Sequence, residues 1–182
     1  MQNHSLKQEI LRDELTQLMN RRSLERELNQ LSTTAIWRIQ PIFSVIVCDI
    51  DYFKLVNDVY GHLIGDEVLQ VLAQRLQGQL RRGTPAYRYG GEEFVVVLTE
   101  TPLSQAVDVA ERLRHTIRST PIQTKVGLID ITASFGIAQQ NISFDSSAWD
   151  VLKRADDALY EAKRQGRDRV YVLKPCLKRA ED

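Results

Sequence analysis

The chain lacks the features that mark secreted, membrane-spanning and nucleic-acid-binding proteins. Its 2 cysteines, Cys48 and Cys176, lie too far apart for a disulfide framework or a metal-ligand spacing, which favours a reducing compartment. Lys plus Arg and Asp plus Glu both number 24, so no net basic charge attracts nucleic acid or an anionic membrane surface. The N-terminus has no apolar signal segment, and no apolar run approaches the roughly 20 residues of a membrane span. We therefore expect a cytoplasmic protein with no nucleic-acid partner and no membrane contact, in which any anionic ligand is held locally.

The remaining composition is that of a globular domain. Of the 182 residues, 43% are apolar, enough for one domain with a sizeable core. We expect this domain over residues 13–173, a linker or stalk at residues 1–12 and a tail at residues 174–182. The stalk would carry a short amphipathic helix, from Ser5 to about Asp13, because apolar residues recur there among charged ones.

Hydrophobic periodicity predicts alternating helices and strands along the domain. Residues 42–50 are an apolar run rich in β-branched residues, which indicates a strand buried on both faces, whereas residues 126–139 alternate as a half-buried strand does. Asn20 and Asp66 are candidate N-caps, the second after a connection at residues 61–65. Helices are expected over residues 21–31, 52–61, 66–81, 103–119 and 148–166, and further strands over residues 86–89, 92–98 and 169–173.

Adjacent glycines decide the expected architecture. Gly90 and Gly91 separate two of the predicted strands and are typical of a two-residue hairpin turn that needs a positive φ at both positions. Such a turn forces an antiparallel pair into a chain that otherwise alternates helix and strand. The sequence therefore predicts an α/β (α+β) fold with a central, mostly antiparallel sheet flanked by helices.

Carboxylates gather at the ends of the predicted strands. Asp49 and Asp51 share a face where the first strand ends, while Glu92 and Glu93 point to opposite faces, so at least one of them is available to a ligand. If the two strands are neighbours, Asp49 and one glutamate converge and repel each other unless a divalent cation lies between them. Oxygen ligands without His or Cys indicate Mg²⁺ or Mn²⁺.

Each of these residues also has an ordinary structural explanation. The two glycines and two glutamates fit a solvent-exposed hairpin, and strand-end aspartates are common turn residues. The same holds for residues elsewhere that hydrogen-bond locally, cap a helix or complement a helix dipole: Asn57, His62, Asp66, Lys163 and Arg167.

The joint order and spacing of these residues resemble the GGDEF family of diguanylate cyclases. The stretch "DIDYFKLVND" begins at Asp49, Gly61-His62 and Gly65-Asp66 follow it, and "RYGGEEF" begins at Arg88. The resemblance continues upstream in "DELTQLMNRR" and downstream in "RADDALYEAKRQGRDRV", so it covers about residues 13 to 172. It implies a fold similar to the palm of nucleotide cyclases and polymerases, and the condensation of two GTP molecules into cyclic di-GMP and two pyrophosphates.

The resemblance also implies a role for each matching residue. Asp49, the backbone carbonyl of Ile50 and Glu92 would hold Mg²⁺ or Mn²⁺, with two ions expected per active site. Glu92, which keeps the carboxylate where the family name has Asp, would also accept the proton of the attacking 3′-hydroxyl, with Glu93 as its acidic partner. Lys54 would stabilise charge in the transition state. The remaining substrate-binding residues would be Phe53, Asn57, His62, Asp66, Gly90, Gly91, Lys163 and Arg167, with Asn57 and Asp66 on guanine and Lys54, Lys163 and Arg167 on the triphosphate.

One site holds one GTP, so the resemblance implies a homodimer with two facing active sites. It also allows an upstream sensor domain, whose sequence is absent from this chain. Asp66 favours GTP over ATP, because a carboxylate accepts the paired donors of guanine and adenine offers no such pair.

Three positions depart from the family pattern. An Arg-x-x-Asp motif for product inhibition becomes Arg81 to Thr84 here, and a neutral hydroxyl replaces its carboxylate. We therefore expect weak or absent product inhibition. Gln17 stands where glycine is usual, and Asp168 where asparagine is usual. The competing hypothesis is a catalytically silent GGDEF domain that acts as a GTP-binding or protein-interaction module.

Overall fold

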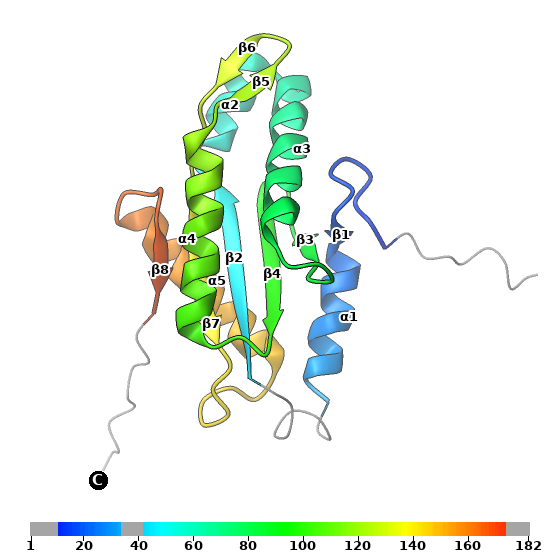
Figure 1. Ribbon diagram of the computed structural model, residues 1–182, viewed down its shortest axis with the longest axis vertical. Helices are drawn as coiled ribbons and strands as arrows, with labels where there is room; N and C mark the ends of the chain where they lie inside the picture. Colours follow the sequence, from blue (N-terminus) through cyan, green and yellow to red (C-terminus); the bar gives the residue numbers. More distant parts are fainter. Residues whose placement is uncertain (1–10, 34–41, 174–182) are drawn as a thin grey trace, which may run out of the picture.

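The computed structural model describes residues 11–33 and 42–173, which form five helices and eight strands. The elements follow one another along the chain as Figure 1 shows. In chain order they are β1 (Met19–Asn20), α1 (Arg21–Leu31), β2 (Phe43–Ile50), α2 (Phe53–Tyr60), α3 (His62–Gln79), β3 (Ala86–Arg88), β4 (Glu93–Thr99), α4 (Leu103–Ser119), β5 (Ile122–Thr124), β6 (Gly127–Ile129), β7 (Ala133–Gln139), α5 (Ala148–Arg164) and β8 (Val170–Val172).

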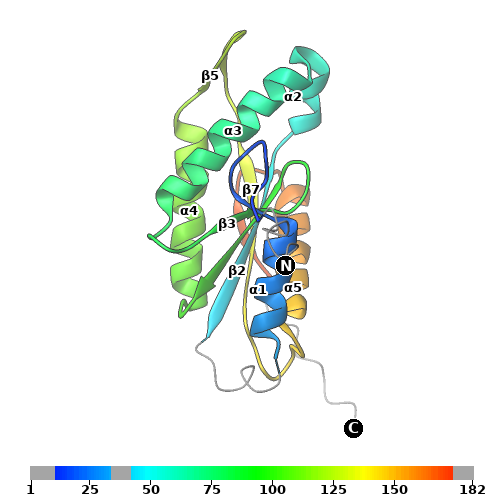
Figure 2. The ribbon, with the colours of Figure 1, turned by 90° about the vertical axis from the view of Figure 1, so that its right-hand side faces the viewer.

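A six-stranded sheet of order β1-β3-β4-β2-β7-β8 forms the centre of the molecule. The central pairs β3/β4, β4/β2 and β2/β7 are antiparallel, and only the outer pairs β1/β3 and β7/β8 are parallel. Helices α3 and α4 cover one face and α1 and α5 the other (Figure 2). The expected mixed, mostly antiparallel sheet with flanking helices is confirmed.

Strand β2 lies in the middle of this sheet because its side chains are apolar on both faces. Ile46 and Cys48 pack with α3 and α4, whereas Val45 and Val47 pack with α1 and α5. All its residues are buried, as predicted. Burial of this kind contributes about 1.5–3 kcal/mol for each large aliphatic side chain. The strand therefore holds its polar end, at Asp49, in a fixed place.

Helix α5 packs directly on the backbone of β7. A Cβ atom on Gly136 of β7 would lie 2.1 Å from the carbonyl oxygen of Ala155 and 2.1 Å from the amide nitrogen of Leu159. Only glycine permits this approach. The close contact places the last turn of α5, with Lys163, over the end of β2.

The start of α3 differs from the prediction. The helix begins at His62, not at Asp66, so Asp66 lies inside the helix and is not its N-cap. Gly61, with φ 85°, makes the break after α2 in a single residue. Residues 62–65 therefore join the helix, and the connection expected there does not exist.

The turn predicted at Gly90 and Gly91 also differs from the prediction. Neither Gly90 nor Gly91 adopts a positive φ. Strand pairing ends with Arg88 opposite Phe94, and the amides of Tyr89 and Gly90 both donate to the carbonyl of Glu93, at 2.8 and 3.3 Å. The connection is thus a wider loop, for which the left-handed geometry of a two-residue turn is not needed.

The segment expected as one half-buried strand is divided. Residues 127–129 form β6, which pairs with β5 in a separate hairpin, and β7 lies in the main sheet with six buried residues out of seven. Because α4 and α5 cover both faces of β7, the alternation in the sequence does not correspond to one exposed face.

The chain ends were predicted as a stalk helix and a tail. The stalk helix falls mainly on residues 1–10, outside the described residues, and Arg12 forms an isolated bridge with Met19 instead of a helical turn. The tail at 174–182 also lies outside them. No helix in the described part of the chain is both long enough and apolar enough to cross a membrane.

Candidate active site

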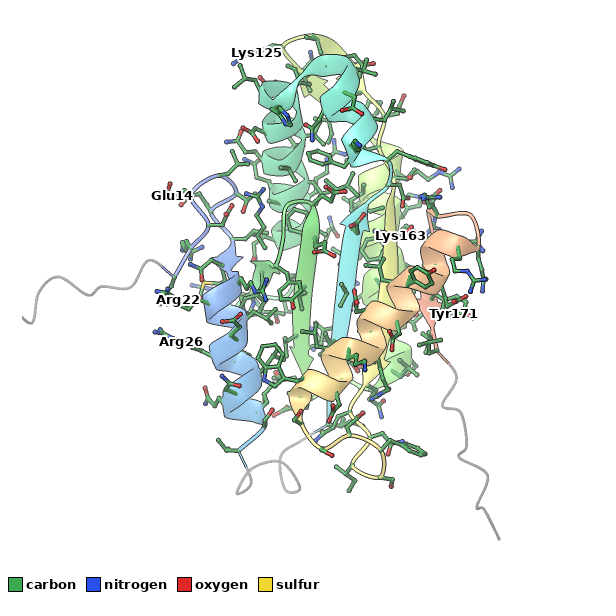
Figure 3. The ribbon with its side chains drawn as sticks, turned by 180° about the vertical axis from the view of Figure 1, so that it is seen from behind. Glu14, Arg22, Arg26, Lys125, Lys163 and Tyr171 are labelled. Carbon is green, nitrogen blue, oxygen red and sulfur yellow. The ribbon has the colours of Figure 1, made fainter. Side chains whose placement is uncertain are left out.

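The centre of the candidate site is a buried ion pair at the end of β2. Asp49 is 5% exposed, and its Oδ2 lies 2.8 Å from Nζ of Lys163. Figure 3 shows Lys163 near the C-terminal end of α5, beside the sheet. The pair unites two residues that the sequence placed far apart, one predicted as a metal ligand and the other as a phosphate ligand.

The strand order predicted that Asp49 and one glutamate converge, and the structure places both Glu92 and Glu93 near Asp49. Glu93 begins β4 and is the direct partner of Asp49 across the β2/β4 ladder. Glu92 belongs to the preceding loop, and its carbonyl accepts a hydrogen bond of 3.4 Å from the amide of Ile50. The backbone thus fixes both glutamates relative to the two predicted ligands on β2.

Burial and mutual repulsion perturb all three carboxyl groups. Burial raises the pKa of Asp49 above its usual value, although Lys163 partly offsets this effect. Burial and the charge of Asp49 raise the pKa of Glu92 and also that of Glu93. When a cation binds between several carboxylates that repel one another, it stabilises their ionised forms.

The absence of a side chain at Gly90 leaves room for the carboxylate of Glu93 in its present position. A Cβ atom at Gly90 would lie 2.5 Å from Oε2 of Glu93, so any side chain there would displace the carboxylate. Gly91 has open space around its Cα, and its carbonyl accepts two hydrogen bonds from the guanidinium of Arg88, at 2.8 and 3.2 Å. Arg88 also forms a 3.0 Å ion pair with Asp13, which links the loop at Gly90 and Gly91 to the loop that contains Asp13.

The predicted guanine-binding residues lie on two helices that meet at a glycine. Oδ1 of Asn57, on α2, would lie 1.9 Å from a Cβ atom on Gly65 of α3. Asp66 follows Gly65, so the structure brings Asn57 and Asp66 to the same helix junction, where both are half-buried. Phe53 is buried beneath this junction. Lys54 and His62 are exposed on the outside of α2 and α3.

Arg167 lies across the ring of Tyr52, a residue that the sequence analysis did not select. Its guanidinium carbon is 4.5 Å from the ring centroid, a cation–π distance. Both residues have left-handed backbones, with φ 63° for Arg167 and 56° for Tyr52. Left-handed non-glycine residues concentrate at functional sites, but the sequence carries no local signal for the left-handed conformation of either residue.

Asp51 has a structural role beside the site. It is 5% exposed, and its carboxylate accepts hydrogen bonds from the hydroxyls of Thr132 and Ser134, both at 2.7 Å, and from the amide of Asp168 at 3.0 Å. These bonds join the end of β2 to β7 and to the loop after α5. The sequence placed Asp51 beside Asp49 but did not predict this use.

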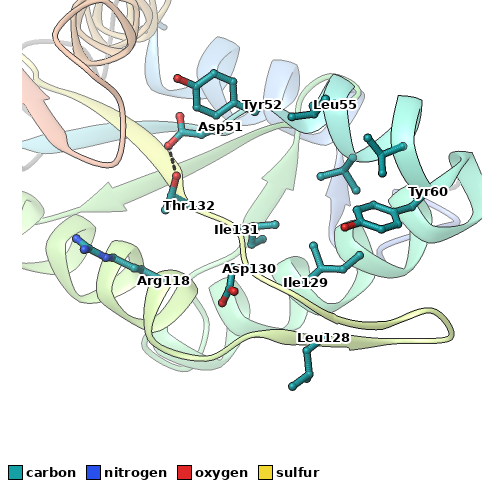
Figure 4. Close-up of a pocket in the computed structure, with 12 residues that line it drawn as sticks. Asp51, Tyr52, Leu55, Tyr60, Arg118, Leu128, Ile129, Asp130, Ile131 and Thr132 are labelled. Carbon is teal, nitrogen blue, oxygen red and sulfur yellow. Dashed lines mark hydrogen bonds between the residues drawn. The ribbon is translucent and has the colours of Figure 1, made fainter.

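Two cavities lie outside this carboxylate cluster. The first, of about 650 Å³, opens between α2 and residues 128–132 and is lined mainly by apolar side chains such as Leu55 and Ile131 (Figure 4). The second, of about 530 Å³, contains Arg81 and Thr84 together with Arg112 of α4. The amide of Thr84 donates to the carbonyl of Arg81 at 3.0 Å, so residues 81–84, which replace the Arg-x-x-Asp motif, form a tight turn at the edge of this cavity.

The donor chemistry at the end of β2 fits a hard divalent cation, because it offers carboxylates without thiols or imidazoles. Lys163 currently supplies the positive charge beside Asp49. Among residues 11–33 and 42–173, no three His, Cys, Asp or Glu side chains stand close enough together to form a complete metal site. The predicted ligands Asp49, Ile50 and Glu92 are neighbours, and a bound cation would compete with Lys163 for Asp49.

The central, mostly antiparallel sheet holds clustered carboxylates and a lysine at one end, and comparison with known proteins identifies the family that has this arrangement. The family model "Diguanylate cyclase, GGDEF domain" matches residues 10–169. The chain therefore belongs to the GGDEF family of diguanylate cyclases.

Individual relatives support this assignment. The chain is 42% identical over 137 residues to Diguanylate cyclase A of Treponema denticola, which covers 75% of this chain and 37% of that protein. The GGDEF domain of DgcB from Caulobacter crescentus, solved in complex with c-di-GMP, superposes with TM-score 0.83 at 32% identity, over 92% of this chain and 98% of that one. An active GGEEF domain of a diguanylate cyclase from Vibrio cholerae gives TM-score 0.79 at 35% identity, over 88% of this chain and 100% of that one. The chain thus spans about a third of the first relative's length.

Proposed function

We propose that this protein condenses two GTP molecules into cyclic di-GMP and two pyrophosphates. The observation that carries the proposal is the group formed by Asp49, Glu92, Glu93 and Lys163 at the end of β2, in a chain that belongs to the GGDEF family. A cytoplasmic location, where GTP is available, belongs to the same proposal.

The reaction is an in-line displacement at the α-phosphorus. The 3′-oxygen of one GTP attacks, pyrophosphate leaves, and the hydroxyl proton passes to the carboxylate of Glu92. Glu92 suits this role because its carboxylate lies at the end of the sheet beside Asp49, where the attacking hydroxyl would be held. The same displacement with the roles of the two nucleotides exchanged closes the ring: the 3′-oxygen of the second nucleotide attacks the α-phosphorus of the first, and a second pyrophosphate leaves.

Asp49, the carbonyl of Ile50 and Glu92 would hold Mg²⁺ or Mn²⁺, two ions per site, with Glu93 beside them. Bound there, the ions would stabilise negative charge on the phosphate oxygens. Lys54, Lys163 and Arg167 would neutralise the triphosphate, and this charge compensation is the main protein contribution to phosphoryl transfer.

Guanine recognition is assigned to the junction of α2 and α3. Asp66 would accept the N1–H and N2–H donors of guanine, and Asn57 would hydrogen-bond its remaining edge, with His62 close to the nucleotide and Phe53 supporting the junction. An unpaired carboxylate against adenine would cost about 1–3 kcal/mol, which favours GTP.

The proposed working unit is a homodimer, because each site holds one GTP and the product needs two. An upstream sensor domain would control this pairing. The experiment is incubation of the purified chain with GTP and Mg²⁺, followed by separation of the nucleotides, with Glu92→Gln as the inactive comparison.

Cyclic di-GMP from the wild type alone, at a rate per monomer that falls on dilution, is the expected result. GTP binding without product at any protein concentration would instead support the silent regulatory module. Inhibition of the wild type by its own product would show that the Arg81–Thr84 turn still works as an inhibitory site.

A further inference from the structure

Asp168 joins the loop after α5 to helix α4 through two ion pairs. Its Oδ1 lies 2.9 Å from Arg114, and its Oδ2 lies 2.9 Å from Arg118. Arg114 also donates a 3.2 Å hydrogen bond to the backbone carbonyl of Asp168. The Asp168 and Arg114 side chains are 22% and 21% exposed, so this pair is largely shielded from solvent. A neutral asparagine at this position could form neither ion pair.

The same residue is fixed through its backbone. Its amide donates to the buried carboxylate of Asp51 at 3.0 Å, and the next residue, Arg169, accepts a 2.9 Å hydrogen bond from Phe135 of β7. Asp168 therefore connects α4, the end of β2 and β7 at one point.

This anchoring holds a strained stretch of backbone. Gly166, Arg167 and Asp168 have successive φ values of 114°, 63° and 43°. Non-glycine residues remain in this region only when the surroundings over-determine them. The middle residue, Arg167, is the one whose guanidinium lies over the ring of Tyr52.

We propose that Asp168 is a positioning residue for GTP binding, in that its two ion pairs with α4 hold Arg167 where it can meet the triphosphate. This inference rests on the proposed function of Arg167. Asp168 does not itself touch the nucleotide. A surface ion-pair cluster that only stabilises the fold is the alternative, and such pairs often contribute little.

The sign of the effect separates positioning from simple electrostatics. Asp168 is negatively charged near a site for a polyanion, so charge alone predicts that Asp168→Asn strengthens GTP binding and that Arg114→Gln weakens it. Positioning predicts that both substitutions weaken binding. It also predicts that the loss of affinity in the double variant is smaller than the sum of the two single losses, because both changes break the same ion pair between Arg114 and Asp168.

The experiment measures KM and kcat for GTP in the full chain carrying Asp168→Asn, Arg114→Gln or both. Affinity for a non-hydrolysable GTP analogue is measured in parallel, with thermal melting as a check of folding. We expect KM and the analogue Kd to rise about 3- to 10-fold in all three, with kcat within about twofold of the wild type.

Glu111→Gln is the matched control. It removes the other carboxylate that pairs with Arg114, at 2.8 Å, with the same change of charge but no link to the loop, and should leave KM unchanged. An unchanged or lower KM in Asp168→Asn, or an equal rise in Glu111→Gln, would overturn the proposal. If the wild type made no cyclic di-GMP, the proposed function would fail, while the analogue affinities would still decide the role of Asp168.

Discussion

Nζ of Lys163 lies 2.8 Å from Oδ2 of Asp49, where the last turn of α5 crosses the end of β2. The ammonium of Lys163 compensates the negative charge of Asp49. The charge of Asp49 still disfavours the ionised forms of Glu92 and Glu93. In the proposed function a cation held by Asp49 would compete with Lys163 for this carboxylate, which would leave the ammonium of Lys163 available to the triphosphate.

Stability should depend on pH through these carboxyl groups. The pKa values of Glu92 and Glu93 are raised in the folded protein, so their contribution to stability is complete below their unfolded values, about 4.5 for Glu, and is lost as the pH rises through the folded values. Urea unfolding from pH 4 upward should therefore show a shallower loss of stability for Glu92→Gln than for the wild type.

Asp13 has the opposite dependence, because its pKa is lowered and its stabilisation is lost as the pH falls. The comparison between variant and wild type cancels this contribution. Parallel curves for the two proteins would contradict the assigned pKa shift of Glu92.

Divalent cations should stabilise the wild type more than the ligand variants. Binding to the folded state alone raises the free energy of unfolding, by about 2.7 kcal/mol at 100 times Kd. We expect Mg²⁺ or Mn²⁺ to raise the melting temperature of the wild type, and to have little effect on Asp49→Asn or Glu92→Gln. An equal shift in Asp49→Asn would place the cation elsewhere.

Gly65→Ala should disrupt the guanine site. The new Cβ would lie 1.9 Å from Oδ1 of Asn57, so the Asn57 side chain must leave its position or α2 must shift. We expect a loss of about 1–3 kcal/mol in stability and a raised KM for GTP, measured by urea unfolding and steady-state kinetics. Gly65→Ala with Asn57→Ala should regain most of the stability but not the KM. Gly78→Ala, where a Cβ meets nothing within 4 Å, is the control.

Asp66→Asn should reduce the preference for GTP over ATP. The amide has one acceptor oxygen and cannot accept the paired donors of guanine as a carboxylate does. The transition state with GTP should therefore lose about 1–3 kcal/mol of stabilisation, which lowers kcat/KM roughly 5- to 150-fold. Competition between GTP and ATP for the site measures the change. Full discrimination in this variant would remove Asp66 from guanine recognition.

Thr84→Asp should create or strengthen product inhibition. The new carboxylate would lie in the cavity that holds Arg81 and Arg112 and would supply the acceptor that the Arg-x-x-Asp pattern requires. Initial rates with added cyclic di-GMP should fall in the variant at concentrations that leave the wild type active. Arg81→Ala in the same background should abolish this inhibition.

The sequence by itself determined the features that depend on local pattern and on motif spacing. The strand expected at 42–50 and observed at 43–50, the helix cap at Asn20 and the helix at 103–119 follow from periodicity and capping, and all are present. Strand-end carboxylates at Asp49 and Glu93 followed from the assumption that their strands are neighbours, which the β2/β4 ladder confirms.

Only the tertiary structure decided how distant segments meet. Hydrogen bonds with Arg88 and Glu93 shape the loop at Gly90 and Gly91. Helix α3 starts where Gly61 breaks the chain after α2, and β7 is buried because helices cover both of its faces. Asp51, at a strand end, accepts a hydrogen bond from the amide of Asp168, in a loop far along the chain, and Asp168 in turn forms ion pairs with Arg114 and Arg118; none of these contacts has a counterpart in the local sequence. Such contacts form only when packing of the core brings their backbones together, so residue type and spacing could name the ligands of this site but not the supports that hold them.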